Sequence, residues 1–178
     1  MAELTFKEKR RKHFNYDIFF SVLRWVFEIA LVCVIAFVVV WYFGQRVHVV
    51  GSSMQPKYEN GDKAHVNRIA YNIGSPKRGD IIAFHPNGNE NAYCYVRRII
   101  GLPGETVELK EGKIYINGKE IEETYDTTAI DDVGIADEPI ELEGNEYFVL
   151  GDNRQNLDDS RSSEIGNVKR SEIEGKVW

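Results

Sequence analysis

The sequence is poor in cysteine, histidine and positive charge. Its two cysteines, Cys33 and Cys94, cannot form a disulfide framework. These cysteines and the four scattered histidines show no metal-ligand spacing, so we expect no metal and no other cofactor. Lys and Arg total 22 against 28 Asp and Glu, a net charge of −6. This acidic balance argues against nucleic acid as a partner, because phosphate binding needs a basic face.

The chain after residue 50 also lacks helical periodicity, internal repeats and low-complexity tracts. It contains short β-type runs separated by turn pairs such as Asn-Gly and Glu-Gly. The acidic stretch 125–139 is predicted to be a surface excursion. We expect one all-β domain over residues 44–178. Its predicted strands cover 46–50, 80–85, 95–100, 106–110, 113–116 and 147–150.

The N-terminal part differs sharply in composition. A basic cluster at 7–12 precedes an uncharged apolar run at 29–43, which extends back to Trp25 with Glu28 as its one carboxylate. A bilayer-spanning helix needs about 20 mostly apolar residues, and basic residues favour the cytoplasmic side. We predict a cytoplasmic basic N-terminus and membrane-interface segment at 1–24, a single transmembrane anchor at 25–43 in the lipid bilayer of the cell membrane, and an external domain at 44–178. A cleaved signal peptide and a buried core helix are the alternatives; no small-x-small cleavage site follows the apolar run.

The stretch GSSMQP, residues 51–56, places Ser53 directly after a predicted strand. A loop serine is more often a solvated or capping residue than a nucleophile. Here Pro56 stiffens the segment and Gly51 allows close approach of a substrate backbone. A nucleophile needs such a rigid position beside a free amide that can stabilise an oxyanion.

Four ordered blocks, VGSSMQP, RGDIIAFHP, YVRRIIGLPGE and GDNRQNLDDSR, resemble the bacterial type I signal peptidases over nearly the whole chain. The resemblance implies a signal-peptidase-type all-β catalytic domain on one membrane helix, acting on signal peptides of exported preproteins. It also implies a serine endopeptidase with a Ser-Lys dyad, in which Ser53 is the nucleophile. The oxyanion would be held by the Ser53 amide and a donor near Gly51.

The same resemblance assigns supporting roles to residues around Ser53. The family's substrate pockets accept short side chains. In this chain the pocket positions are Val49, Val50, Met54, Tyr58, Tyr95 and Val96. The loop beneath the site would be locked by pairing of Asp159 with Arg161. The full set of supporting positions is Asp152, Asn153, Leu157, Asp159, Ser160 and Arg161.

Two positions depart from the family pattern. The dyad lysine is replaced by Arg97, and the serine that would orient that lysine is replaced by Leu157. A buried lysine can lose its proton near neutral pH, whereas arginine effectively never does. Arg97 therefore cannot serve as the general base, although it can orient or stabilise an anion.

A few other residues could in principle replace the missing lysine as base or Ser53 as nucleophile. His48 and His65 have suitable ordinary pKa values but match no family site. Lys63 is most simply a solvated strand residue, and Cys94 is a conceivable nucleophile without an evident base.

Two functions remain open at this point, an active signal peptidase and a catalytically impaired peptide-binding or surface-assembly protein. A self-cleaving repressor-type domain is disfavoured by the membrane segment and by the lack of a DNA-binding segment.

Overall fold

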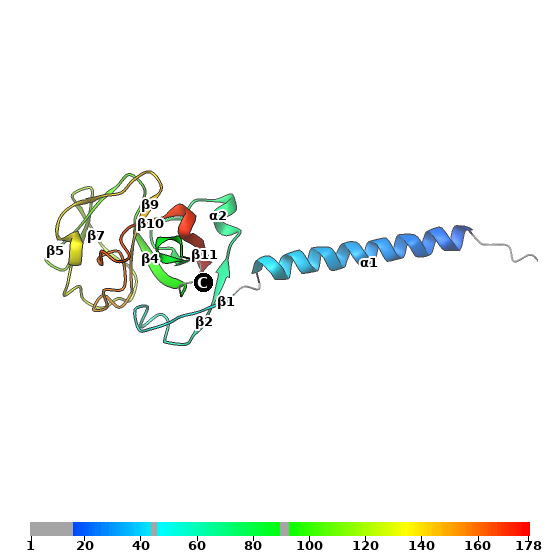
Figure 1. The fold of residues 1–178 in the computed structure, drawn as a ribbon, viewed down its shortest axis with the longest axis horizontal. Coiled ribbons are helices and arrows are strands. Elements are labelled where there is room, and N and C mark those ends of the chain that lie inside the picture. The colour runs from blue at the N-terminus through cyan, green and yellow to red at the C-terminus, as the bar shows by residue number, and fades with distance from the viewer. Residues whose placement is uncertain (1–15, 44–45, 90–92) are drawn as a thin grey trace, which may run out of the picture. The chain divides into compact units, whose positions relative to one another are not determined.

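The structure of the protein is a computed structural model that describes residues 16–43, 46–89 and 93–178. The chain divides after Val39 into two compact units. The first holds most of helix α1 and the second holds a domain made mainly of strands (Figure 1). The predicted all-β fold is confirmed for this domain.

Helix α1 (Tyr16–Phe43) is longer than the predicted anchor, because it begins well before Trp25. Its stretch Tyr16–Trp41 is long and apolar enough to cross a membrane. Arg24 Nε and Glu28 Oε1 lie 3.0 Å apart across one helical turn, so the single carboxylate of the apolar run has a cationic neighbour. The basic cluster at 7–12 lies outside the described residues.

The larger sheet has seven strands in the order β1-β2-β11-β3-β4-β9-β10, and every neighbouring pair is antiparallel. Its strands are β1 (Arg46–His48), β2 (Lys63–Asn67), β3 (Ile81–Phe84), β4 (Tyr95–Gly101), β9 (Glu146–Leu150), β10 (Val168–Lys169) and β11 (Ile173–Val177).

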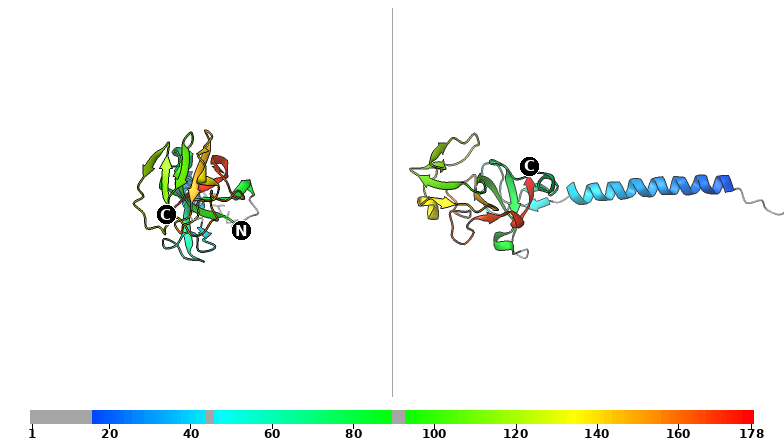
Figure 2. Two further views of the ribbon diagram at one scale, coloured as in Figure 1. Left: turned by 90° about the vertical axis from the view of Figure 1, so that its left-hand side faces the viewer. Right: turned by 90° about the horizontal axis from the view of Figure 1, so that it is seen from above.

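The smaller sheet has four strands in the order β7-β6-β5-β8. They are β5 (Thr106–Lys110), β6 (Lys113–Ile116), β7 (Lys119–Ile121) and β8 (Ile140–Glu141). Two-residue turns at 111–112 and 117–118 join three of these strands, and all four turn residues have positive φ. This is the turn chemistry that tight hairpins require. The smaller sheet lies at one end of the domain and β1 at the other (Figures 1 and 2).

Short helices complete the domain. They are α2 (Ala70–Ile73), η1 (Pro86–Gly88), η2 (Gly134–Asp137) and η3 (Arg170–Glu172). The segment predicted as a surface excursion contains only η2 as regular structure.

Side chains along the central strands point alternately to the two faces of the larger sheet, and each face has a layer of buried apolar residues. In β3, Ile81 and Ala83 join one cluster of buried residues, whereas Ile82 and Phe84 join another. Successive side chains of a strand point to opposite faces, so a strand buried on both sides reads as a continuous apolar run. A third cluster packs the smaller sheet against the ends of β4 and β9.

Candidate active site

Ser53 lies in the loop between β1 and β2. Its residue is 1% exposed, and its Oγ is one of the buried side-chain atoms with no hydrogen-bond partner among the described residues. Gly51, two residues earlier, has a φ of 86°, a left-handed conformation that favours glycine. The loop is therefore fixed by local geometry, and the hydroxyl is left without a partner.

The Gly51 amide is already occupied, because it donates to Asn60 Oδ1 at 2.9 Å. This contact ties the Ser53 loop to the turn that precedes β2. The amide of Ser53, by contrast, donates no hydrogen bond to the residues that the structure describes. An unengaged amide next to the nucleophile is the kind of donor that an oxyanion site needs.

The loop that follows β9 is hydrogen-bonded to the Ser53 loop. Asn153 N donates to the Ser53 carbonyl at 3.0 Å, and Asn153 Nδ2 donates to the Ser52 carbonyl at 3.1 Å. A Cβ on Gly151 would lie 2.4 Å from the Ser53 carbonyl oxygen. Only glycine therefore fits at this crossing without moving the serine backbone.

Arg97 is buried in β4, 2% exposed. Its Nε donates to the Asp158 carbonyl at 2.5 Å, and its Nη1 donates to the Val96 carbonyl at 2.6 Å. The guanidinium carbon lies 5.1 Å from the centre of the Tyr95 ring. Burial lowers the pKa of Arg97, while the negative charges of Asp159 and Asp158 act in the opposite direction.

The hydrogen bond from Arg97 to the Asp158 carbonyl places Arg97 at the same turn as Leu157, because Asp158 directly follows Leu157 in the chain. Leu157 is half-buried, and its aliphatic side chain offers no hydrogen bond to a cation. Arg97 and Leu157 are thus neighbours in space. Two of the N–H groups of Arg97 donate to main-chain carbonyls, and neither contact gives the guanidinium a way to accept a proton.

Arg98 has a different environment from Arg97. Its Nε and Nη2 donate to the two carboxylate oxygens of Asp152 at 2.7 and 2.6 Å, and both side chains are buried. Its guanidinium carbon lies 4.0 Å from the centre of the Tyr125 ring. Arg98 therefore joins β4 to the loop after β9.

The same loop contains a second buried ion pair. Arg161 Nη2 lies 2.8 Å from Asp159 Oδ2, and Arg161 Nε lies 2.9 Å from Asp159 Oδ1. Asp159 Oδ2 also accepts from the Gly151 amide, and Ser160 Oγ accepts from the Val149 amide.

A further buried ion pair was not predicted from the sequence. It joins Arg154 to Glu123 at 2.6 Å. Nothing in the sequence marks Glu123 as the partner of Arg154, because the two are joined only by the fold.

The predicted pocket residues fall into three groups. Val49, Met54 and Val96 are buried together in one cluster, and Tyr58 packs against it. Tyr95 lies on the other face of β4, with Phe84 at a ring distance of 6.0 Å. The Val50 residue is 54% exposed.

The substitutes considered for the dyad are placed less favourably. His48 and His65 lie on the exposed side of β1 and β2, and Lys63 is exposed as well. Burial raises the pKa of the Cys94 thiol to about 11, so it is protonated at neutral pH. A protonated, half-buried thiol is a poor nucleophile.

Comparison with known proteins assigns the family. The profile of the family described as signal peptidase, peptidase S26, matches residues 22–178. The chain belongs to the signal peptidase I family. It is 34% identical to signal peptidase I P of Bacillus subtilis subsp. natto, over 95% of this chain and 90% of that protein. It is 33% identical to signal peptidase IB of Staphylococcus aureus strain COL, over 88% of this chain and 87% of that protein.

A crystal structure of a signal peptidase I from Enterococcus faecalis is also similar. It shares 36% sequence identity and covers 59% of this chain and 98% of that chain, with a TM-score of 0.46. As a signal peptidase I family member, this chain carries Ser53 in a loop held from two sides and Arg97 at a buried position that reaches the Leu157 turn.

Proposed function

We propose that this chain is a membrane-anchored serine endopeptidase that accepts signal peptides of exported preproteins, with Ser53 as its nucleophile. The observation that carries the proposal is the Ser53 hydroxyl, which is buried and unpartnered beside a main-chain amide that makes no hydrogen bond to the described residues. In this proposal the Ser53 Oγ attacks the scissile carbonyl, and the amide stabilises the resulting oxyanion.

The substrate would be recognised through short side chains near its cleavage site. The cluster of Val49, Met54 and Val96, with Tyr58 against it, is apolar and closely packed. A substrate pocket walled by such side chains would favour small apolar groups. We propose that Val50 and Tyr95 contact the substrate at separate points, because they do not share this cluster.

Access to such substrates would follow from the helix. We propose that α1 crosses the cell membrane once, with the basic N-terminal segment in the cytoplasm and residues 44–178 outside. The apolar stretch Tyr16–Trp41 supports a span, and the basic cluster at 7–12 supports the direction. This orientation would present the domain to signal peptides as they emerge from export.

Arg97 limits the rate that this site can reach. A base must accept the Ser53 proton during attack, and a guanidinium cannot do so near neutral pH. Binding and oxyanion stabilisation alone leave serine protease sites with a residual acceleration of roughly 10³–10⁴ over water. We therefore expect slow, Ser53-dependent cleavage.

A second candidate function is a catalytically impaired protein that binds signal peptides or assists surface assembly. The observation in its favour is that the buried Arg97 guanidinium donates to two main-chain carbonyls, that of Asp158 beside Leu157 and that of Val96 in β4. In that case the proposed substrate pocket would retain affinity for signal peptides while Ser53 served only as a neutral packing group.

One assay separates the two candidates. The full chain in detergent would be incubated with a preprotein that carries a small-x-small cleavage site, beside Ser53→Ala, Arg97→Lys and Arg97→Lys/Leu157→Ser variants. Slow cleavage that disappears in Ser53→Ala supports the endopeptidase. Cleavage seen only after Arg97→Lys, alone or with Leu157→Ser, rejects it and supports the impaired protein.

A further inference from the structure

His85, Cys94 and Glu174 meet at the edge of the domain, although they are far apart in the sequence. One nitrogen of His85, the sulfur of Cys94 and one carboxylate oxygen of Glu174 all lie within 4.8 Å of one another. The sequence showed no metal-ligand spacing, because these residues come from three separate strands or strand ends. None of the three has a role in the proposed peptidase chemistry.

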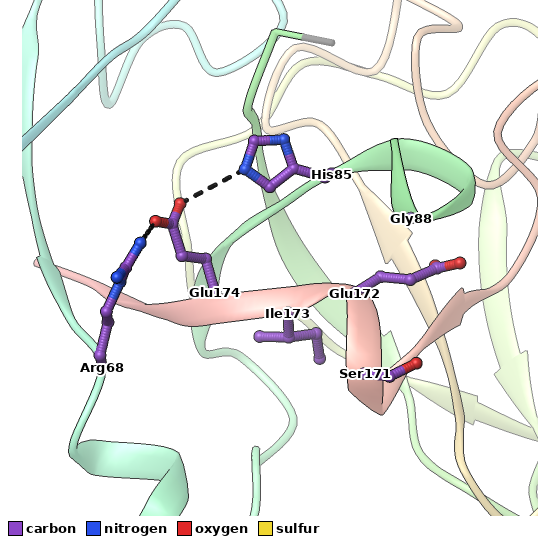
Figure 3. A pocket seen from close by; sticks show the side chains of 7 residues that line it. All are labelled: Arg68, His85, Gly88, Ser171, Glu172, Ile173 and Glu174. Carbon is purple, nitrogen blue, oxygen red and sulfur yellow. Dashed lines mark hydrogen bonds and ion pairs between the residues drawn. The ribbon is translucent and has the colours of Figure 1, made fainter. Parts of the chain in front are cut away.

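Strand pairing explains why they meet. Phe84 of β3 pairs with Tyr95 of β4, so His85 and Cys94 are the next opposite positions beyond this pair. Glu174 sits between Ile173 and Gly175, where the register of β11 against β3 shifts. Such a bulge turns a side chain away from its regular direction. The bulge directs the Glu174 carboxylate toward His85 (Figure 3).

The contacts among the three ligand atoms are long. His85 Nε2 lies 3.7 Å from Glu174 Oε2, and Cys94 Sγ lies 3.6 Å from the same oxygen. The first distance is longer than a hydrogen bond, and the second is only a weak sulfur contact. The other ring nitrogen of His85, Nδ1, is buried without a partner among the described residues. Among residues 16–43, 46–89 and 93–178, neither imidazole nitrogen therefore has a hydrogen-bond partner.

The same distances suit a shared cation. Ligand bonds to zinc of about 2.0–2.3 Å, at tetrahedral angles, place neighbouring ligand atoms roughly 3.3–3.8 Å apart. Imidazole, thiolate and carboxylate are the three ligand types that zinc uses in proteins. Three protein ligands leave a fourth position open, and His85 and Glu174 border a cavity of about 450 Å³.

Arg68 completes the arrangement on the far side of the carboxylate. Its Nη2 makes a short ion pair with Glu174 Oε1, which leaves Oε2 facing His85 (Figure 3). Cys94 Sγ contacts the same Oε2 atom. An outer partner of this kind fixes the orientation of a ligating carboxylate. Its positive charge is balanced by Glu174, and a thiolate at Cys94 would add the negative charge that a divalent cation needs.

We propose that His85, Cys94 and Glu174 form a binding site for a divalent transition-metal ion of the zinc type. The ion would bind one imidazole nitrogen, the Cys94 sulfur and Glu174 Oε2, and the thiol proton would be released to solvent as the metal–sulfur bond forms. The site would join β11, β3 and β4. Cys94 also packs against the cluster of Val49, Met54 and Val96, so the ion would bind beside the proposed substrate pocket.

Cobalt(II) titration of the full chain in detergent tests the proposal, because cobalt reports both geometry and thiolate ligation. We expect one equivalent to bind with the visible bands of a tetrahedral site and a near-ultraviolet thiolate-to-cobalt band, both abolished by zinc. Cys94→Ser should lose the thiolate band. His85→Gln and Glu174→Gln should weaken binding by more than the roughly 10- to 100-fold that loss of an outer partner costs.

Two matched controls should behave like the unaltered protein. Cys33→Ser removes the other cysteine, and Glu172→Gln alters a carboxylate that borders the same cavity but accepts from the Lys169 amide. Circular dichroism of each variant shows whether it is folded. A thiolate band that persists in Cys94→Ser, or its absence from the unaltered protein, overturns the proposal.

A protection experiment needs no variant within the site. In the Cys33→Ser background, zinc should slow alkylation of Cys94 by at least about tenfold, and a chelator should restore the original rate. Equal alkylation rates with and without zinc would contradict the site even if the ligand variants failed to fold.

Discussion

The α-carbon of Gly151 faces the carbonyl oxygen of Ser53 so closely that a methyl group on it would lie 2.4 Å from that oxygen. The same oxygen accepts from the Asn153 amide at 3.0 Å. The loop after β9 thus positions the Ser53 loop through main-chain contacts. The backbone of residues 151–153 therefore helps to decide where Ser53 lies.

Gly151→Ala should displace the Ser53 backbone. We expect a loss of about 1–3 kcal/mol in the free energy of unfolding, typical of an overpacked site, and a lower rate of Ser53-dependent cleavage. Gly144→Ala is the matched control, because a Cβ at Gly144 meets no atom within 4 Å. Urea unfolding of both variants measures the difference. Equal free energies of unfolding for the two variants would show that the Ser53 loop moves away from the new methyl group without loss of stability.

Asp152→Asn should be strongly destabilising, since it leaves the buried guanidinium of Arg98 without its counter-charge. Breaking a buried ion pair from one side costs about 3–5 kcal/mol. The control is Glu120→Gln, which breaks the exposed pair between Glu120 and Lys113 and should cost about 0–1 kcal/mol. Denaturant unfolding of the two variants should differ accordingly; similar losses would argue that the Arg98 pair is solvated.

Asn60→Ala should loosen the Ser53 loop, because it removes the acceptor of the Gly51 amide. We expect a loss of about 0.5–1.5 kcal/mol in unfolding free energy. Asn60→Asp keeps an acceptor at the same place and should lose less. Hydrogen exchange at the Gly51 amide gives an independent measurement, and it should be faster in Asn60→Ala than in Asn60→Asp. Equal exchange rates would rule out the contact as the source of protection.

Cys94 should react slowly with iodoacetamide at neutral pH, because burial raises the pKa of its thiol to about 11. In the Cys33→Ser background the rate should rise about tenfold per pH unit up to that value, since only the thiolate reacts. The unfolded thiol ionises near its ordinary pKa of about 8.5. The buried Cys94 thiol therefore makes its full contribution to the free energy of unfolding below a pH of about 8.5. That contribution is lost as the pH rises toward 11. A rate that levels off near pH 8.5 would contradict the burial of the thiol.

Arg97→Lys/Leu157→Ser should give the chain a base that can lose its proton. We expect the rate of preprotein cleavage to rise by about 10²–10⁴-fold, the usual contribution of a positioned general base. The rate should also increase with pH as the lysine becomes neutral. Arg97→Met is the matched control, because it removes the cation without adding a base. A rate that is unchanged in the lysine variant would mean that the Leu157 turn does not place the amine near Ser53.

Several strands could be predicted from local sequence because their signal is local. The runs at 106–110 and 113–116 alternate in polarity and are joined by a Glu-Gly turn, and the structure has strands with these bounds. Strands β7, β8 and β10 were missed because two or three residues carry too little pattern. Strand β11 was missed because its sequence, IEGKV, contains a glycine and two charges.

The sequence by itself determined the family, the order of the motifs and the chemical limit at Arg97. These depend on residue identity, since no fold can make a guanidinium an efficient base near neutral pH. Only the tertiary structure decided which distant groups meet: Arg97 with the Asp158 carbonyl, Arg154 with Glu123, and His85 with Glu174. Such contacts follow from strand order, register and a bulge, which are set by packing over the whole domain rather than by any short stretch of the chain.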